Sequence, residues 1–351
     1  MIKEAIGTLA KGKALTRDEA SLVMEEIMDG KATQAQLGAF LTALSIKGET
    51  SDEIAGLAKV MRDKAVRVNI EGPVLDIVGT GGDGLNTINI STAAAFVIAG
   101  AGVKVAKHGN RAATGKCGSA DVLEKLGIVL SLTSDQVAQC IREIGISFMF
   151  APAFHPAMKH ASGPRREIGI RTVFNILGPL TNPAYAEHIV LGVPTQALAE
   201  KIVPALLHLD IRHALVVCGL NGMDELSISG KSLYWEVKNG TIITSAKSIS
   251  PGDFGLSVAS EESIRGGMAE DNAAILKNIL AGQPGPQRDI IVLNAAAALL
   301  AADRADSWQQ GMRLSQESID TGKAQQKLSD LILLTQKLTG IKNDSTSNSA
   351  K

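Results

Sequence analysis

Residues 74–107, VLDIVGTGGDGLNTINISTAAAFVIAGAGVKVAK, contain the pattern that indicates the fold class. VLDIV (74–78) is a short apolar run with β-branched residues, which indicates a strand. GTGGDG (79–84) is a glycine loop, residues 87–102 are alanine-rich and helical, and VKVAK (103–107) indicates a second strand. Strand, loop, helix and strand make one βαβ unit, so the pattern predicts a parallel sheet.

The glycine loop is suited to an anion. Without Cβ atoms its backbone can approach a phosphate closely, and the following helix directs free N–H groups and a positive dipole end at the ligand. Asn89, Ser91 and Thr92 crowd the expected helix start and add side-chain donors. The stretch therefore predicts a phosphate site, and the plainer alternative is a tight turn with ordinary helix caps.

GTGGDG also matches the GxGxxG pattern of dinucleotide-binding folds. Those folds place an acid at the end of the second strand to hold ribose hydroxyls. Here that strand ends in Lys107, and His108, Asn110 and Arg111 follow. A basic cluster replaces the acid, while Asp83 within the loop suits ribose hydroxyls or a metal better than a bare pyrophosphate. The run 109–117 resembles a phosphate-binding P-loop, but its glycine spacing differs and Cys117 stands where a hydroxyl should hold Mg²⁺.

Residues 1–66 predict about four short helices. Three hydroxyl–acid or hydroxyl–amide pairs fit capping boxes: Thr16 with Glu19, Thr33 with Gln36, and Thr50 with Glu53. Glu71-Gly72-Pro73 then marks a turn. We expect a helical domain over residues 1–70, an α/β domain over residues 74–341, and a disordered polar tail over residues 342–351.

Further elements are expected beyond residue 180. Strands are predicted at 189–193, 213–219, 232–237 and 240–245. Helices are predicted at 197–209, 262–281 and 289–302. The predicted fold class is therefore α/β: a small N-terminal helical domain and a larger domain whose central, mostly parallel sheet is flanked by helices.

Composition narrows the function. The 351 residues include 35 basic and 36 acidic ones, and aromatics make up 3%, so neither a basic patch nor stacking platforms favour nucleic acid. We predict no transmembrane helix and no secretory signal. Three scattered cysteines form no disulfide framework, which indicates a reducing compartment and a cytoplasmic protein.

Two distant segments supply chemistry that the loop lacks. Asp224 and Glu225 follow the apolar strand at 213–219, and ligands bind at such carboxyl ends in open α/β sheets. One or two carboxylates with phosphate oxygens suit Mg²⁺, although a lone acidic pair is more often a solvated turn. Arg165 can fork onto a carboxylate, and the alternative is a basic surface turn.

Segments spread over nearly the whole chain resemble the anthranilate phosphoribosyltransferase family in order and sequence. These are DIVGTGGDG (76–84), NIST (89–92), KHGNRA (107–112), GSADVLEKLG (118–127), FAPAFHPAMK (150–159), PRREIGIRTVFNILGPLTNPA (164–184), GMDELS (222–227) and PGPQRDIIVLNAAAAL (284–299). The resemblance implies a cleft between a helical and an α/β domain, and a homodimer formed largely through the helical domain. It also implies that helices near 165–185 join the helical domain.

The resemblance implies phosphoribosyl pyrophosphate and anthranilate as substrates, with Mg²⁺ as cofactor. Similarity assigns anthranilate to Gly79, Asn110 and Arg165, and the metal to Ser91, Asp224 and Glu225. It assigns phosphoribosyl pyrophosphate to Gly79, Gly82, Asp83, Thr87, Asn89, Ile90, Ser91, Thr92, Lys107, His108, Gly109, Asn110, Arg111, Ala112, Ala113, Thr114, Gly115 and Ser119. No catalytic base is assigned, because an aromatic amine is already unprotonated at neutral pH.

Two features depart from the family. Residues 112–117 lack the serine-rich composition common there, and Thr87 stands where serine is common. Two other functions stay open at this stage. A pyrimidine nucleoside phosphorylase shares the architecture, and a non-catalytic nucleotide-binding protein could use the same scaffold. Arg165 together with the acidic pair favours the transferase.

Overall fold

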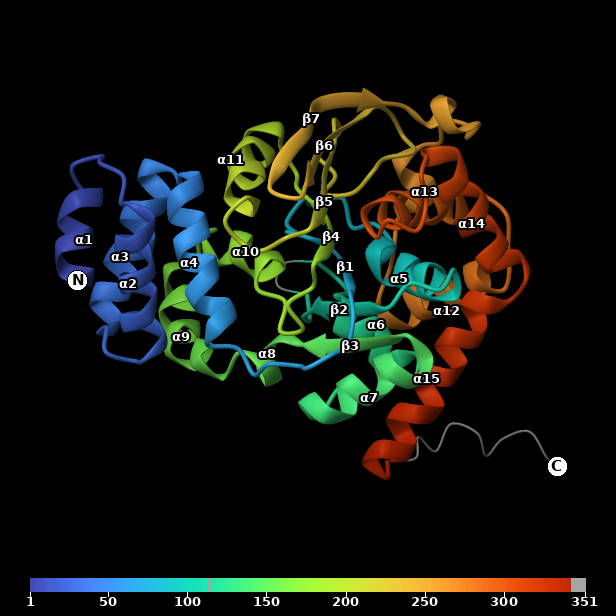
Figure 1. Ribbon diagram of the computed structural model, residues 1–351, viewed down its shortest axis with the longest axis horizontal. Helices are drawn as coiled ribbons and strands as arrows, with labels where there is room; N and C mark the ends of the chain where they lie inside the picture. Colours follow the sequence, from blue (N-terminus) through green and yellow to red (C-terminus); the bar gives the residue numbers. More distant parts are fainter. Residues whose placement is uncertain (113–114, 342–351) are drawn as a thin grey trace.

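A seven-stranded sheet runs through the larger part of the molecule, in the order β3-β2-β1-β4-β5-β6-β7 (Figure 1). The computed structural model describes residues 1–112 and 115–341. The strands are β1 (Leu75–Gly79), β2 (Val105–Gly109), β3 (Ile146–Phe150), β4 (His188–Gly192), β5 (His213–Gly219), β6 (Ser232–Lys238) and β7 (Thr241–Ile249). Strands β1 to β5 pair in parallel, and β6 and β7 pair antiparallel at one edge. The predicted α/β fold class is confirmed.

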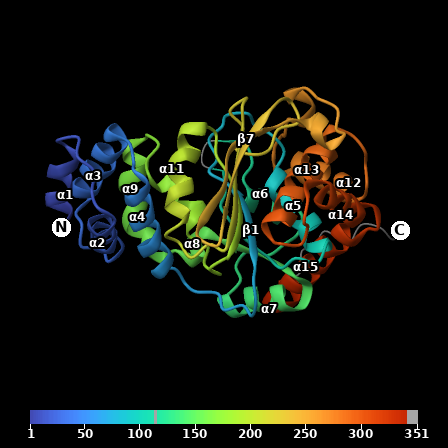
Figure 2. The same ribbon diagram turned by 45° about the horizontal axis from the view of Figure 1, so that its top comes forward.

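The helices form two groups, one on each side of the sheet (Figure 1, Figure 2). The first group contains α1 (Ile2–Leu9), α2 (Arg17–Met28), α3 (Gln34–Lys47), α4 (Ser51–Asp63), α8 (Ala151–Phe154), α9 (Lys159–Ile168), α10 (Phe174–Leu177) and α11 (Gln196–Leu206). The second contains α5 (Ile90–Gly100), α6 (Ser119–Lys125), α7 (Ser134–Ile144), α12 (Ala269–Leu280), α13 (Pro286–Ala301), α14 (Trp308–Asp320) and α15 (Lys323–Thr339). Four short 3₁₀ turns lie at Pro156–Met158, Gly178–Leu180, Pro251–Phe254 and Glu261–Ile264.

Alternation along the strands builds two cores from one sheet. Leu215 and Val217 of β5 pack with α5 and α13 in one buried cluster, whereas Ala214 and Val216 belong to the cluster that includes the N-terminal helices. Successive strand residues point to opposite faces, so each strand contributes to both cores. This explains why β5 is buried over its whole length.

The N-terminal helices form through the predicted caps. The hydroxyls of Thr16, Thr33 and Thr50 each accept the N–H three residues on, and the side chain there returns the bond. Helices α9 and α10 pack against this bundle, and Ala161 and Phe174 lie in its core. The N-terminal bundle is therefore extended toward the sheet by α9 and α10, two helices that follow β3 in the chain.

One expected helix is wrong in part. The sequence predicts a single helix over residues 262–281, but a 3₁₀ turn and an extended segment precede α12, which begins at Ala269. Gly266 donates its N–H to the Asn86 carbonyl, and Arg265 pairs with Thr87 in an isolated bridge. A Cβ on Gly266 would lie 2.7 Å from the Thr87 carbonyl oxygen. Pairing with a distant loop therefore overrides the local helical pattern.

Strand β3 is not predicted by the sequence, and the start of α5 lies three residues later than expected, at Ile90. Asn86 adopts a left-handed φ of 52° and Thr87 is held in the bridge, so residues 87–89 remain outside the helix. Residues 342–351 and the loop positions Ala113 and Thr114 lie outside the described residues, so the expectation of a disordered tail stands untested.

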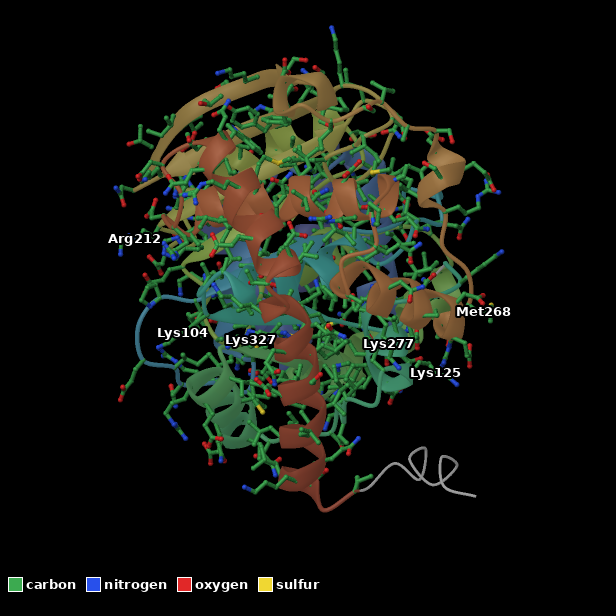
Figure 3. The ribbon with its side chains drawn as sticks, turned by 90° about the vertical axis from the view of Figure 1, so that its right-hand side faces the viewer. Lys104, Lys125, Arg212, Met268, Lys277 and Lys327 are labelled. Carbon is green, nitrogen blue, oxygen red and sulfur yellow. The ribbon has the colours of Figure 1, made fainter. Side chains whose placement is uncertain are left out.

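The far side of the molecule from the bundle is covered by α15 (Figure 3). Lys327 of that helix donates to the Ile144 carbonyl at 2.7 Å, where α7 ends before β3. Lys327 is labelled in Figure 3. In the part of the chain that the structure describes, no helix is long and apolar enough to cross a bilayer.

Candidate active site

A cavity of about 1,020 Å³ opens at the carboxyl ends of β1, β2 and β3, and the segment after β5 contributes Asp224 and Glu225 to its wall. Strands β2 and β4 flank β1 on opposite sides, so the cavity lies where the strand order reverses, which is the usual ligand position in such sheets. The site residues predicted from the sequence line it, apart from Ala113 and Thr114, which lie outside the described residues. These are Gly79, Gly82, Asp83, Thr87, Asn89, Ile90, Ser91, Thr92, Lys107, His108, Gly109, Asn110, Arg111, Ala112, Gly115, Ser119, Arg165, Asp224 and Glu225.

The glycine loop is held by two side chains from elsewhere. The Asp224 carboxylate accepts the Gly81 N–H at 2.6 Å. Arg171, after α9, donates to the carbonyls of Gly81 and Gly82 at 2.9 Å each. Gly81 and Gly82 both have left-handed φ values, of 71° and 75°, which glycine adopts without strain. The sequence assigns Arg171 no role, because spacing along the chain does not reveal its distant partners.

The close approach at the end of β1 requires glycine for a second reason. A Cβ on Gly79 would overlap the Asp224 carboxylate, and one on Gly192 would overlap the Asp224 backbone carbonyl. Gly79 and Gly192 are register partners in β1 and β4. The missing side chains therefore leave the space in which the acidic segment meets the glycine loop.

Lys107 lies beneath the start of α5. Its Nζ donates to the Ile77 carbonyl at 2.6 Å and to the Ser91 hydroxyl at 3.2 Å, and only 3% of the residue is exposed. Burial lowers the pKa of Lys107, and the carboxylates of Asp76 and Glu225 oppose that shift. The hydroxyl of Thr92 has no hydrogen-bond partner among the described residues. A lysine and a free hydroxyl at a helix start are suited to phosphate oxygens.

Asn89 occupies the N-cap position of α5 without capping it. Its amide donates to the Cys117 carbonyl at 3.1 Å and accepts a bond from Asn272 of α12 at 2.9 Å. Asn272 also accepts the Gly267 N–H at 2.8 Å. The Asn89 side chain thus ties together three segments of the cavity wall, and the backbone N–H groups of α5 stay available.

The described residues on either side of 113–114 are held by Asp121 of α6. Its carboxylate accepts the Gly118 N–H at 2.8 Å, the Ala112 N–H at 3.1 Å and the Arg111 guanidinium at 2.9 Å. Arg111 is also paired with Glu124 and lies over the Phe150 ring. This arrangement commits the Arg111 guanidinium to the loop itself.

The carboxylates of Asp83, Asp224 and Glu225 lie close together in the cavity wall. Burial and the neighbouring Asp83 raise the pKa of Asp224 to about 7, and burial with Asp224 raises the pKa of Glu225 to about 8. Lys107 partly offsets the shift at Glu225. Crowded, partly desolvated carboxylates of this kind favour a bound cation. Mg²⁺ takes one or two carboxylates and fills its other positions with water and phosphate oxygens, so this donor set fits it.

Two histidines, His108 and His155, form a further part of the cavity wall, the histidine wall. The rings of His108 and His155 are 5.0 Å apart between centroids, and burial lowers their pKa values to about 3 and about 4. Both rings are therefore neutral at pH 7. Their Nε2 atoms have no partner within the described residues. The sequence places His155 only within a motif, and its part in the site depends on this contact across the fold.

Arg165 reaches the cavity from α9. Its guanidinium lies 4.9 Å from the centre of the Phe174 ring, and burial lowers the pKa of this guanidinium from its ordinary value. No carboxylate is paired with it in the described part of the chain. A half-buried guanidinium without an acidic partner is suited to a ligand carboxylate.

The chain is similar to a known family in two parts. Residues 3–65 match the model described as a glycosyl transferase family, helical bundle domain, and residues 71–325 match the same family's a/b domain. The anthranilate phosphoribosyltransferase of Dehalococcoides mccartyi is 61% identical over 338 residues, which cover 96% of this chain and 99% of that protein.

Solved structures agree with these matches. The anthranilate phosphoribosyltransferase of Thermus thermophilus superposes with a TM-score of 0.89 at 41% identity, covering 95% of this chain and 99% of its own. The Saccharomyces cerevisiae enzyme in complex with PRPP and Mg superposes with a TM-score of 0.86 at 31% identity, covering 96% and 98%.

Proposed function

The chain belongs to the anthranilate phosphoribosyltransferase family, and we propose that its cleft transfers the 5-phosphoribosyl group from phosphoribosyl pyrophosphate to the amine of anthranilate. The products are N-(5-phosphoribosyl)anthranilate and pyrophosphate, as in the second step of tryptophan synthesis from chorismate. One observation carries this proposal. A single cavity brings together the glycine loop, the acidic pair and the unpaired Arg165, although Gly81 and Asp224 are 143 residues apart in sequence.

The donor half of the site comprises the glycine loop, Lys107 and the start of α5. The free N–H groups of α5, with Ser91 and Thr92, bind the phosphate oxygens, and Lys107 adds a buried positive charge. Asp83 accepts hydrogen bonds from the ribose hydroxyls. Asp224 and Glu225, with the Ser91 hydroxyl, hold Mg²⁺, which supplies positive charge to the departing pyrophosphate when bound.

The remaining donor contacts come from the loop that follows β2. Gly79, Gly82, Thr87, Asn89, Ile90, His108, Gly109, Asn110, Arg111, Ala112, Gly115 and Ser119 complete the phosphoribosyl pocket, as do Ala113 and Thr114 outside the described residues. Because Arg111 is already paired with two carboxylates, it acts mainly by shaping this loop.

The acceptor half lies between α9 and the histidine wall. Arg165 forks onto the anthranilate carboxylate, and Asn110 and the backbone at Gly79 contact the same molecule. The neutral rings of His108 and His155 provide a flat, uncharged part of the cavity wall next to it. Uncharged histidines avoid repulsion with Arg165, so the pocket accepts a carboxylate and an aromatic ring together.

The chemistry follows from this placement. The amine nitrogen of anthranilate attacks the anomeric carbon while the bond to pyrophosphate breaks, so positive charge develops on the ribose and negative charge on the leaving group. Lys107 and the helix N–H groups stabilise the leaving group. Holding both substrates in line supplies much of the remaining acceleration. The nitrogen loses its proton after attack, and no side chain needs to remove it beforehand.

The domain division supports the same function. We assign residues 1–70 to a helical domain together with α9 and α10, whose side chains lie in its core, residues 74–341 otherwise to the α/β domain, and residues 342–351 to a tail. The helical domain is proposed as the homodimer surface, because Leu22 and Ile46 are exposed on it. Three cysteines without disulfides support a cytoplasmic protein.

One assay tests the proposed function. Purified protein is mixed with Mg²⁺, phosphoribosyl pyrophosphate and anthranilate, and pyrophosphate and phosphoribosylanthranilate are both measured. We expect the two products in equal amounts and no turnover when anthranilate is left out. Turnover of a pyrimidine nucleoside with inorganic phosphate instead would assign the cleft to a phosphorylase, and an absence of both reactions would indicate a binding protein.

A further inference from the structure

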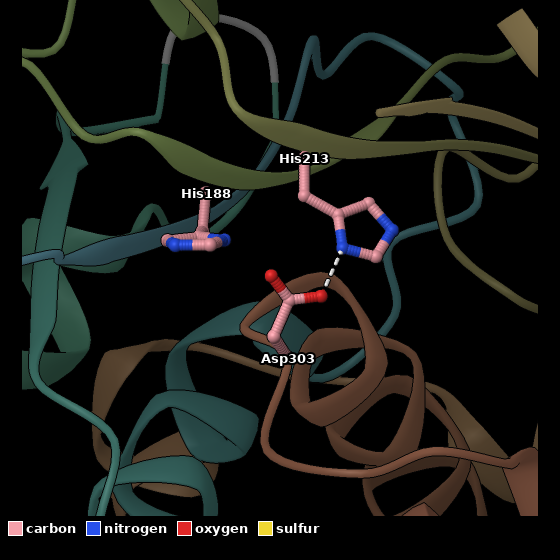
Figure 4. A group of neighbouring side chains, drawn as sticks. All are labelled: His188, His213 and Asp303. Atoms are coloured by element: carbon pink, nitrogen blue, oxygen red, sulfur yellow. Dashed lines mark hydrogen bonds and ion pairs between the residues drawn. The ribbon is translucent and has the colours of Figure 1, made fainter. Parts of the chain in front are cut away.

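A second cluster of metal-ligating side chains lies at the amino ends of two central strands, on the opposite side of the sheet's strand ends from the cleft. His188 and His213 are the first residues of β4 and β5, and Asp303 follows the end of α13 (Figure 4). One ring nitrogen of each histidine and one carboxylate oxygen lie within 4.8 Å of one another. In residues 1–112 and 115–341, no other group of three such side chains comes as close.

The outer nitrogens of both histidines are already occupied by acceptors. His188 Nδ1 lies 2.6 Å from the Ala301 carbonyl oxygen, and His213 Nε2 lies 3.0 Å from a carboxylate oxygen of Glu236. These bonds leave His188 Nε2 and His213 Nδ1 for the inside of the cluster. Metal-binding histidines in proteins commonly donate their second N–H to a carbonyl or a carboxylate in this way.

The third side chain is positioned by the backbone. Asp303 has a left-handed φ of 54°, and its N–H is bonded to the Leu300 carbonyl at the end of α13. Its carboxylate oxygen lies 2.9 Å from His213 Nδ1 and 2.7 Å from the ammonium of Lys238. The positively charged Lys238 side chain therefore already lies beside this carboxylate. His188 and His213 are buried, at 4% and 3% exposure, whereas Asp303 is exposed, so an ion can approach from the Asp303 side.

We propose that His188 Nε2, His213 Nδ1 and the Asp303 carboxylate form a second metal site, which takes Zn²⁺ with water in the fourth position. Two imidazoles and one carboxylate are typical zinc ligands, whereas Mg²⁺ prefers oxygen donors, so this site differs in chemistry from Asp224 and Glu225. The ion ties the amino ends of β4 and β5 to α13. It displaces the Lys238 ammonium from Asp303. Metal binding at this site does not depend on the phosphoribosyl transfer reaction.

Equilibrium dialysis tests the site directly. Chelator-treated protein is dialysed against ZnCl₂ with excess Mg²⁺, and bound zinc is measured by mass spectrometry. Wild type and Asp224→Asn are expected to hold one zinc per chain. Removing a ligand in Asp303→Asn is expected to weaken binding ~100-fold or more. Full zinc binding by Asp303→Asn, or none by wild type, would overturn the proposal.

A second variant keeps all three ligands and predicts the opposite change. Lys238→Gln removes the competing ammonium, so zinc is expected to bind about 10-fold more tightly. Co²⁺ bound in place of zinc should show the visible absorption of a tetrahedral site in wild type and Lys238→Gln. Unchanged zinc affinity in Lys238→Gln would contradict the placement of the ion on the Asp303 carboxylate. Circular dichroism confirms that each variant is folded, and phosphoribosyl transfer by Asp303→Asn should stay at the wild-type rate.

Discussion

Replacing Asp224 by asparagine is predicted to stabilise the metal-free protein. Burial and the Asp83 carboxylate raise the pKa of Asp224 from 3.8 to about 7. The pKa of Asp224 is higher in the folded state than in the unfolded state. The protonated side chain therefore contributes its full stability below about pH 4, and this contribution is lost as the pH rises through 7. At ~1.4 kcal/mol per pKa unit, the ionised carboxylate lowers the free energy of unfolding by at most ~4 kcal/mol at pH 8.

The expected shift in melting temperature is smaller than this limit. Asp224 is partly exposed to the cleft, and water there screens the repulsion, so about half the limit, ~2 kcal/mol, is expected to remain. An unfolding entropy of ~2.1 cal/mol/K per residue over 351 residues then gives a rise in Tm of about 3 °C. The amide oxygen of the substituted side chain can still accept the Gly81 N–H, so the glycine loop keeps its contact.

Thermal denaturation by circular dichroism, with a chelator at pH 8 and pH 5, measures this effect. The gain should be larger at pH 8, and Asp306→Asn, which changes an exposed carboxylate, should leave Tm within about 1 °C. Mg²⁺ with phosphoribosyl pyrophosphate should raise the Tm of wild type by more than that of Asp224→Asn. A lower Tm for Asp224→Asn at pH 8 in chelator would show that the ionised Asp224 carboxylate does not destabilise the metal-free fold.

Four further changes have defined outcomes. Arg165→Ala should raise the KM for anthranilate by the equivalent of ~1–3 kcal/mol, in steady-state kinetics, and an unchanged KM would count against its role. Replacing Asp224 and Glu225 together should abolish the Mg²⁺ dependence of turnover, so a wild-type Mg²⁺ titration would contradict the metal assignment. Gly79→Ala should lower kcat/KM roughly 10- to 100-fold by displacing the Asp224 carboxylate, a charged hydrogen-bond acceptor, whereas Gly230→Ala, which has open space around it, should not. Burial lowers the pKa of His155 to about 4, so its contribution to stability is present above pH 6.5 and is lost as the pH falls through 4. Between pH 7 and pH 5, wild type should lose about 2 kcal/mol more unfolding free energy than His155→Gln does. An equal loss in the two proteins would show that the His155 ring is in water.

Local patterns predicted the parts of the fold that depend on neighbouring residues. The capping threonines, the strand at 213–219 and the glycine loop before α5 each follow from a short run of sequence, and each lies where it was expected. One failure occurs where distant segments meet. The helix predicted over 262–281 gives way to pairing with the loop at 86–88, because backbone bonds there replace a helical turn.

The same distinction applies to the site. The glycine loop and the acidic pair could be found from their positions after strands. Arg171 and His155 could not, because their partners, Gly81, Gly82 and His108, are far away in sequence. The cluster of His188, His213 and Asp303 was missed for the same reason, since 90 residues separate the last two.

A crystal structure with phosphoribosyl pyrophosphate, Mg²⁺ and an unreactive anthranilate analogue tests the assignment of the cleft most directly. We expect the pyrophosphate at the start of α5 beside Lys107, the metal on Asp224 and Glu225, and the analogue's carboxylate on Arg165. A pyrophosphate bound away from the glycine loop, or a carboxylate bound away from Arg165, would contradict this assignment.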